Sequence, residues 1–318
     1  MRALKLVEPK RVEIVEIPDP NPGAGEVLVR MEGCGLCGSN LPVWQGRPWF
    51  QYPLEPGAPG HEGWGRIAAL GPGVTGLRPG QRVAVLSYKA LAEYDVADAG
   101  ALVALPEALD GQVVPGESLG CAINVFRRSD ISAGQTVAIV GLGFIGCLVA
   151  QLAARAGARV IAISRRAYSL ALARDMGAHQ TATLEQDDGD LVGQIEAWTD
   201  GQLCDRVIEA VGVQRTLDVA AKITRIRGRL IIAGYHQDSP RQVDMQLWNW
   251  RGLDVVNAHE RDAKVYVEGM RAAIDAIVAG ELDPTPLYTH AVDLADANEL
   301  FTALDERPDG FVKAQVML

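Results

Sequence analysis

The first quarter of the chain alternates apolar and polar residues over short stretches that are separated by turns. Stretches 12–17 and 27–31 alternate in this way, and the proline-rich segment 18–23 lies between them. Two further apolar stretches, 65–70 and 81–86, are bounded by Gly-Pro-Gly and Pro-Gly turns. A period of two residues with glycine and proline turns is typical of β-strands. The pattern therefore predicts a barrel-like β domain in this part of the chain.

The pattern changes near Gly116, after which strand-like stretches alternate with stretches of helical period. The expected strands are 136–140, 160–164, 205–209, 229–233 and 253–257. Between them, helical patterns occupy stretches such as 148–156, 166–176 and 217–222. Strands that alternate with helices are typical of βαβ units. We therefore expect the α/β class, with a doubly wound parallel sheet.

The length of the chain indicates two domains, because 318 residues exceed what one hydrophobic core usually supports. The last part contains a helical stretch at 265–279 and an amphipathic stretch at 294–304. A segment this short cannot bury enough apolar surface to fold alone. We therefore expect residues 261–318 to complete the β domain of residues 1–122, while residues 123–260 form the doubly wound domain.

The net charge and the cysteine content indicate which binding partners and which cellular compartment to expect for the protein. The net charge of -10 argues against nucleic acid and against anionic membranes, which both attract clustered Lys and Arg. The uncharged run 136–154 contains three glycines, so a strand and a buried helix explain it better than a membrane span. The first residues become charged too early for a signal peptide, and the cysteines are odd in number. The cytoplasm is therefore the expected compartment.

A glycine-rich loop follows the first strand of the second domain and opens a helix: Gly141-Leu142-Gly143-Phe144-Ile145-Gly146. In such a loop Gly141 permits the tight turn, Gly143 lets backbone N–H groups approach a pyrophosphate, and Gly146 allows the helix to pack closely on the strand. The helix N-terminus, with Phe144 and Ile145, offers free N–H groups and a partial positive charge to phosphates. This context predicts dinucleotide binding; the alternative is a glycine-rich turn in a fold without a cofactor.

The end of the following strand indicates which nicotinamide cofactor binds. An NAD site normally has Asp or Glu there, whereas an NADP site lacks the acid and supplies arginine. Here Ser164 occupies that position, and Arg165 and Arg166 follow it. A carboxylate would repel a 2′-phosphate, whereas a guanidinium offers it a bidentate fork. The sequence therefore favours NADP(H) over NAD(H), unless both arginines are merely solvated residues at a helix start.

Residues suited to metal binding occur in two glycine-rich segments. His61 and Glu62 are adjacent in Gly60-His61-Glu62-Gly63-Trp64-Gly65, and Cys37 lies upstream in Gly35-Leu36-Cys37-Gly38-Ser39-Asn40. Imidazole, carboxylate and thiolate are all good zinc donors, and a catalytic metal needs few protein ligands and one open position. Cys34 and Cys37 form the only C-x-x-C, so a four-cysteine structural site cannot be assembled from such pairs.

The spacing of the His-Glu segment, with Gly65, Gly71 and Val74, resembles the zinc signature of the medium-chain alcohol dehydrogenases. The order of elements resembles this family along nearly the whole chain, and the sorbitol and threonine dehydrogenase type in particular. The resemblance implies a Rossmann domain, a GroES-like β-barrel catalytic domain and a catalytic zinc. The cysteine-rich lobe that holds a structural zinc in other members is missing between residues 85 and 92. We therefore expect one zinc ion per chain.

The resemblance also implies roles for residues near the expected zinc. Glu117 matches an acidic residue that binds zinc or hydrogen-bonds its water, and Cys121 is a rival ligand whose offset matches less well. Ser39 matches the residue that relays the substrate's hydroxyl proton, a role compatible with helix capping. Asn40 replaces the aspartate usual in the family's run. The implied zinc ligands are therefore Cys37, His61, Glu62 and Glu117.

Zinc beside a nicotinamide implies polarised hydride transfer between NADP(H) and a secondary alcohol or ketone. Ser39, Cys37, His61 and Glu62 are the expected catalytic residues. The aromatic segment 43–52 and Trp64 would form walls for a sugar or cyclitol ring, form a pocket for an aromatic alcohol or aldehyde, or fill the core. Together with Glu117, these aromatics favour a polyol, sugar or cyclitol substrate.

Two functions of other classes stay open at this point. One is a zinc-free quinone or enone reductase, against which the three ligand residues argue. The other is a non-catalytic NADP(H)-binding protein. The expected partners are a small-molecule alcohol or ketone and further copies of the chain in a dimer or tetramer, with no nucleic acid and no membrane.

Overall fold

The computed structural model describes residues 1–184 and 188–318, and the chain divides into two compact units. Unit 1 consists of Met1–Cys121, Arg261–Gly280 and Tyr288–Leu318, and unit 2 consists of Ala122–Glu260 and Glu281–Leu287. The sequence assigned all of 261–318 to the β domain, whereas the structure groups 281–287 with unit 2. This segment is held there because the backbone N–H of Asp283 donates to Oε1 of Gln151 at 2.7 Å.

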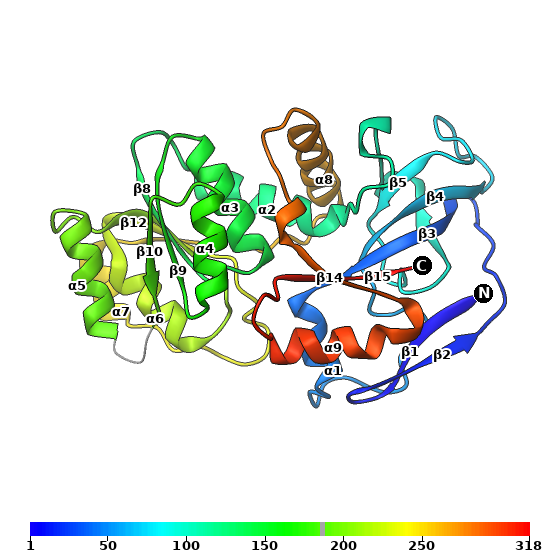
Figure 1. Ribbon diagram of the computed structural model, residues 1–318, viewed down its shortest axis with the longest axis horizontal. Helices are drawn as coiled ribbons and strands as arrows, with labels where there is room; N and C mark the ends of the chain where they lie inside the picture. Colours follow the sequence, from blue (N-terminus) through cyan, green and yellow to red (C-terminus); the bar gives the residue numbers. More distant parts are fainter. Residues whose placement is uncertain (185–187) are drawn as a thin grey trace. The chain divides into compact units, whose positions relative to one another are not determined.

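A parallel sheet forms the centre of unit 2 (Figure 1). Among the described residues its strands lie in the order β10-β9-β8-β11-β12-β13, and every neighbouring pair is parallel. The strands are β8 (Thr136–Val140), β9 (Arg159–Ser164), β10 (Gln180–Thr183), β11 (Cys204–Glu209), β12 (Thr224–Ile232) and β13 (Asp254–Asn257). The order reverses between β8 and β11, where doubly wound sheets bind their ligands. The predicted α/β fold class is confirmed.

Two helices, α3 (Phe144–Arg155) and α4 (Ala167–Asp175), pack on β8, β9 and β10. Two others, α6 (Gln214–Ile223) and α7 (Met245–Arg251), pack on β11 and β12, and α5 (Asp188–Trp198) packs on α6. The residues of β8 from Val137 to Val140 are completely buried, on both of its faces. Parallel strands covered on both faces read as continuous apolar runs, which explains the sequence of β8. The uncharged run 136–154 thus forms β8 and most of α3. No helix within the described ranges is both apolar and long enough to cross a membrane.

Unit 1 is built on antiparallel strands around β3 (Glu26–Leu36), which pairs with β4, β6 and β15. The described sheet has the order β14-β15-β3-β4-β5-β7, and a separate hairpin joins β1 and β2. The remaining strands are β1 (Arg2–Glu8), β2 (Arg11–Glu16), β4 (Glu62–Leu70), β5 (Arg82–Val85), β6 (Tyr94–Asp98), β7 (Leu102–Ala104), β14 (Tyr288–Asp293) and β15 (Lys313–Met317). The C-terminal segment therefore contributes strands to the β unit.

Helices complete unit 1: α1 (Leu41–Trp44), α8 (Ala263–Val278), α9 (Ala297–Glu306) and the first residues of α2 (Gly116–Ser129). Trp44 stacks on Phe301 of α9 with ring centroids 5.1 Å apart, and both side chains belong to the hydrophobic core. Trp64 is also fully buried. Of the alternatives for these two tryptophans, the core role is the one that the structure shows.

The strand register brings the candidate site together at one end of β3. Gly35 of β3 is opposite Glu62 of β4 on one side and opposite Gln315 of β15 on the other. Cys37 follows the last residue of β3, and His61 precedes the first residue of β4. Antiparallel pairing therefore places the two glycine-rich segments side by side.

Candidate active site

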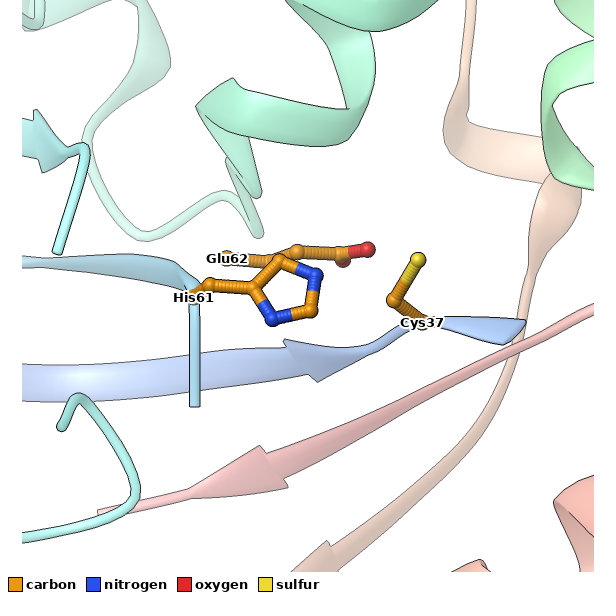
Figure 2. Close-up of side chains that lie close together, drawn as sticks. All are labelled: Cys37, His61 and Glu62. Atoms are coloured by element: carbon orange, nitrogen blue, oxygen red, sulfur yellow. The ribbon is translucent and has the colours of Figure 1, made fainter. Parts of the chain in front are cut away.

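Cys37, His61 and Glu62 converge in unit 1, as their spacing predicts. One donor atom from each lies within 4.8 Å of the donor atoms of the other two. Figure 2 shows the thiol, the imidazole and the carboxylate directed toward a common point. Glu62 is buried, whereas Cys37 and His61 are partly accessible. The cluster can thus be reached from solvent on one side, as a metal that also holds substrate requires.

Asn40 connects the two segments that carry these side chains. Its Oδ1 accepts the backbone N–H of Cys37 at 2.8 Å, and its Nδ2 donates to the carbonyl of Pro59 at 3.2 Å. Asn40 is buried, and its backbone lies in the short 3-10 helix η1 (Gly38–Asn40). An aspartate in this position could accept from Cys37 but could not donate to Pro59. The substitution of Asn for the family's usual Asp therefore adds a hydrogen bond.

The imidazole of His61 is oriented by the same carbonyl. Its Nδ1 lies 2.9 Å from the Pro59 oxygen, and its Nε2 lies 3.4 Å from Oγ of Ser39. Only a protonated Nδ1 can donate to a carbonyl, so Nε2 is the nitrogen left to bind a metal. A backbone acceptor behind the ring is the usual means of fixing the tautomer of a metal-binding histidine.

Negative charge accumulates around His61. Burial lowers the pKa of His61, but the hydrogen bond and charge of Cys37 outweigh it. With the further charges of Glu117 and Glu62, the pKa rises to about 10. An imidazole with this many anionic neighbours lies in a site that favours a cation.

The donor set fits a zinc ion. Glu62 has one carboxylate oxygen, Oε2, paired with the ammonium of Lys313. Its other oxygen, Oε1, is buried and has no hydrogen-bond partner among the residues that the structure describes. A buried carboxylate oxygen without a donor is costly in free energy unless a cation compensates it. Thiolate, imidazole and carboxylate together are typical of catalytic zinc sites.

Glu117 lies beside the cluster but is not one of its three members. It occupies the first turn of α2 and is buried. Burial raises the pKa of Glu117, and the charge of Glu62 adds to this effect, whereas His61, Cys121 and Lys313 oppose it. These interactions place its carboxylate near both His61 and Glu62. Its Oε1 accepts a hydrogen bond from Sγ of Cys121 at 3.2 Å.

The predicted cofactor loop has the geometry that its glycines suggest. Gly141 follows β8 with a φ of 105°, which L-residues rarely adopt. A Cβ on Gly146 would overlap the carbonyl oxygen of Gly141, so only glycine lets α3 approach so closely. A Cβ on Gly143 would meet nothing within 4 Å. Gly143 precedes α3, whose first residues are Phe144 and Ile145, so space remains where the helix N-terminus is open.

The residues after β9 differ in accessibility. Ser164 ends β9, and its Oγ accepts the backbone N–H of Arg166 at 3.2 Å. The guanidinium of Arg166 donates to the carbonyl of Leu142 in the glycine loop at 3.3 Å. Arg165 is exposed. Arg166 is therefore tied to the cofactor loop, whereas Arg165 extends into solvent.

Two residues beside the cluster were missed from the sequence. Lys313 reaches Glu62 from β15; a lysine within an otherwise apolar segment was a signal that it needs a buried partner. The ring of Tyr88 lies nearly parallel to that of His61, with centroids 6.4 Å apart and an interplanar angle of 11°. Tyr88 belongs to the short connection between β5 and β6, and it is exposed. No sequence pattern marked this residue.

Comparison with known families matches both units. Residues 145–276 match the zinc-binding dehydrogenase family, and residues 23–107 match the alcohol dehydrogenase GroES-like domain. The two matches together cover more than half of the chain. The predicted combination of a Rossmann domain and a GroES-like β domain is thus confirmed.

Individual relatives span almost the whole chain. The 2-dehydro-3-deoxy-L-galactonate 5-dehydrogenase of Pseudoalteromonas atlantica is 27% identical over 98% of this chain and 97% of its own. The sorbitol dehydrogenase of Gallus gallus is 26% identical over 89% of this chain and 87% of its own. A structure described as a zinc-binding dehydrogenase from Sinorhizobium meliloti 1021 bound to NADP is 26% identical, with a TM-score of 0.86, and covers 100% of this chain and 99% of its own.

These similarities agree with the His-Glu spacing, the glycine loop and the converging donors of Cys37, His61 and Glu62. The protein is therefore a zinc-type oxidoreductase, and the chain belongs to the zinc-dependent medium-chain dehydrogenase/reductase superfamily, which includes the alcohol, sorbitol and threonine dehydrogenases.

Proposed function

We propose that the protein transfers hydride between NADP(H) and a secondary alcohol or ketone, and that its substrate is a polyol, sugar or cyclitol. The observation that carries this proposal is the convergence of Cys37, His61 and Glu62 within 4.8 Å in a chain that also has the glycine loop. A single zinc ion bound there supplies Lewis acidity toward the substrate oxygen. The nicotinamide supplies or accepts the hydride.

The protein's own side chains hold the metal and move the proton. Cys37, His61 and Glu62 are the ligands in this proposal, and Glu117 is the fourth partner, directly or through water. The hydroxyl of Ser39 lies 3.4 Å from Nε2 of His61, which places it beside the nitrogen that binds the metal. Ser39 therefore relays the proton: during oxidation its Oγ accepts the hydroxyl proton of the alcohol while its own proton passes outward to solvent, and during reduction both transfers run in reverse.

The cofactor is held by unit 2 in this proposal. The glycine loop from Gly141 to Gly146, with the start of α3, binds the pyrophosphate through backbone N–H groups. Ser164 leaves room where an acidic residue would repel a 2′-phosphate, and Arg165 and Arg166 bind that phosphate. The NADP bound to the relative from Sinorhizobium meliloti supports this choice.

The substrate class is supported by one residue and by two relatives. Glu117 supplies an acidic neighbour to the metal, as in the sorbitol dehydrogenase type that the chain resembles. The names of two relatives refer to sorbitol and to a galactonate derivative. Burial of Trp44 and Trp64 removes these residues from any substrate wall. Tyr88 remains as an exposed aromatic face next to His61.

A turnover assay tests the proposal. The zinc-loaded protein is assayed with NADPH and NADH against ketoses, cyclitol ketones and aromatic ketones, and with NADP+ against the matching alcohols. We expect turnover with NADPH and a polyhydroxylated substrate, loss of turnover after chelation, and recovery with zinc. Preference for aromatic ketones would reassign the substrate class. Unchanged turnover after complete removal of zinc would refute the role of the metal.

We also propose that the protein is a cytoplasmic homo-oligomer. Strand β13 lies at one end of the described sheet, and α7, which packs on its neighbour β12, carries accessible apolar side chains. Trp250 is 85% exposed and Met245 is 59% exposed. Apolar side chains beside an unpaired strand edge are typical of an association surface. Sedimentation analysis of the wild type and of Trp250→Glu tests this; a monomeric wild type would refute it.

A further inference from the structure

A buried ion pair crosses the sheet behind the candidate metal centre. Glu62 starts β4 and Lys313 starts β15, and these two strands lie on opposite sides of β3. Gly35 of β3 is opposite Glu62 and opposite Gln315, two residues after Lys313, and a Cβ there would overlap Oε2 of Glu62. The glycine therefore lets the carboxylate lie across β3 and reach the ammonium of Lys313 on the far strand.

Lys313 is confined by its surroundings. It is only 4% exposed, and its Nζ donates to the carbonyl of Leu36 at 3.1 Å. Leu36 precedes Cys37, so the ammonium contacts one metal ligand directly and the backbone next to another. The ammonium therefore lies between the carboxylate of Glu62 and the carbonyl of Leu36.

The two carboxylate oxygens of Glu62 differ in their surroundings. Oε2 is taken by Lys313, while Oε1 has no hydrogen-bond partner among the described residues. The carboxylate thus has one oxygen committed to a fixed cation and one available to a second cation. Removal of either charge from such a buried group leaves the other poorly compensated.

We propose that Lys313 is a permanent counter-cation that shares Glu62 with the metal and weakens the metal's hold on that ligand. The inference rests on the proposed zinc function. Two physical effects have the same sign. The ammonium withdraws charge from the carboxylate, and it repels a divalent ion bound to the same group. A less strongly donating Glu62 also leaves the metal a stronger Lewis acid toward substrate.

This proposal predicts that substitution of Lys313 changes the zinc affinity in an unusual direction. Substitution of an ordinary orienting group behind a metal ligand weakens metal binding, typically by about 10–100-fold. Neutralisation of Lys313 should instead tighten zinc binding, because the metal becomes the only cation available to Glu62. In the metal-free protein the same change should lower the thermal unfolding midpoint, since a buried carboxylate loses its partner.

The test measures zinc affinity by competition with a chromophoric chelator at mildly alkaline pH. Lys313→Gln removes the charge but keeps a hydrogen-bond donor, Lys313→Met removes both, and Lys313→Arg keeps the charge. We expect zinc to bind about tenfold or more tightly to the Gln and Met variants, a change of the size that outer groups usually produce. The Arg variant should retain the wild-type affinity. Folding is checked by circular dichroism, and Lys313→Gln carries the test if Lys313→Met does not fold.

A double-mutant cycle separates the charge effect from general disturbance. In a Glu62→Gln background, Lys313→Gln should no longer tighten zinc binding, because the shared carboxylate is gone. Unchanged or weaker zinc binding in Lys313→Gln alone would overturn the inference while the proposed function stands. A wild type that binds no zinc would instead overturn the proposed metal function, and this inference with it.

Discussion

The thiol of Cys121 donates a hydrogen bond to Oε1 of Glu117 from one turn further along α2, at 3.2 Å. Burial raises the pKa of Cys121 well above its ordinary value, and the charge of Glu117 raises it further. The thiol is therefore already directed at the carboxylate of Glu117 rather than at the cluster of Cys37, His61 and Glu62. This geometry is our reason for proposing Glu117, and not Cys121, as the fourth partner of the metal.

Substitution of Glu117 should impair the enzyme, whereas substitution of Cys121 should not. We expect Glu117→Ala to lower kcat/KM and zinc affinity by about 10–100-fold, the range typical of groups that support a metal. Cys121→Ala should leave both quantities near the wild-type values and reduce only packing. Zinc competition and steady-state kinetics on both variants decide the assignment. An inactive Cys121→Ala protein with an active Glu117→Ala protein would make the sulfur the ligand.

Cys37→Ser should abolish turnover and loosen zinc while leaving NADPH binding intact, because the cofactor loop belongs to the other unit. Cys34→Ala is the matched control from the same C-x-x-C. Cys34 is completely buried in the core, so its substitution should reduce the thermal unfolding midpoint but keep the zinc. Elemental analysis should find one zinc per chain in the wild type. If Cys34→Ala lost its zinc and Cys37→Ser kept it, the assignment of zinc binding to Cys37 and of core packing to Cys34 would be wrong.

Cofactor preference should depend on Arg165 more selectively than on Arg166. We expect Arg165→Ala to weaken NADPH binding and leave NADH binding unchanged, since each charge-assisted contact contributes about 1.5–3 kcal/mol. Arg166→Ala should weaken both cofactors, because Arg166 also holds the carbonyl of Leu142. Ser164→Asp should shift preference toward NADH. Fluorescence titration measures all three, and equal losses for both cofactors in Arg165→Ala would exclude its role.

Gly35→Ala should disrupt the metal centre, although alanine adds a single methyl group. Its Cβ would overlap Oε2 of Glu62, so the carboxylate must leave its position within 4.8 Å of the donor atoms of Cys37 and His61. We expect zinc affinity to fall by about 10–100-fold. Gly38→Ala is the control in the same segment, since its Cβ would meet only Nη2 of Arg307 at 3.7 Å. A wild-type zinc affinity in Gly35→Ala would show that the carboxylate does not need its position over β3.

The sequence was most informative where chemistry and local pattern coincide. The stretch predicted at 136–140 is β8, because a continuous apolar run ends at a glycine loop that leaves little choice of strand end. The cluster of Cys37, His61 and Glu62 could be anticipated because His61 and Glu62 are adjacent and Cys37 lies in a similar glycine-rich segment. Both features depend on residues that are close together in the sequence, so the hydrophobic period and the residue spacing were enough to predict them.

Features that depend on distant contacts were not predictable. Strand β15 was missed because Lys313 and Gln315 interrupt its apolar residues, and the buried lysine is explained by its distant partners Glu62 and Leu36. Strand β12 begins at Thr224 rather than at 229, where the apolar pattern starts. The sequence could not show whether the tryptophans near Cys37, His61 and Glu62 belong to the core or to a substrate-binding wall. Trp44 is buried by Phe301, a residue that is distant in the sequence.

The contact between Lys313 and Leu36 joins residues that are 277 positions apart. Unit 2, in contrast, is almost continuous from Ala122 to Glu260. Closing so long a loop is slow compared with local folding, and chains fold by domains as they leave the ribosome. We therefore expect the cofactor unit to fold first during synthesis, while β3 waits for β15. The proposed metal centre is then completed only after β15 has been synthesised, so zinc is expected to enter a chain whose cofactor unit has already folded.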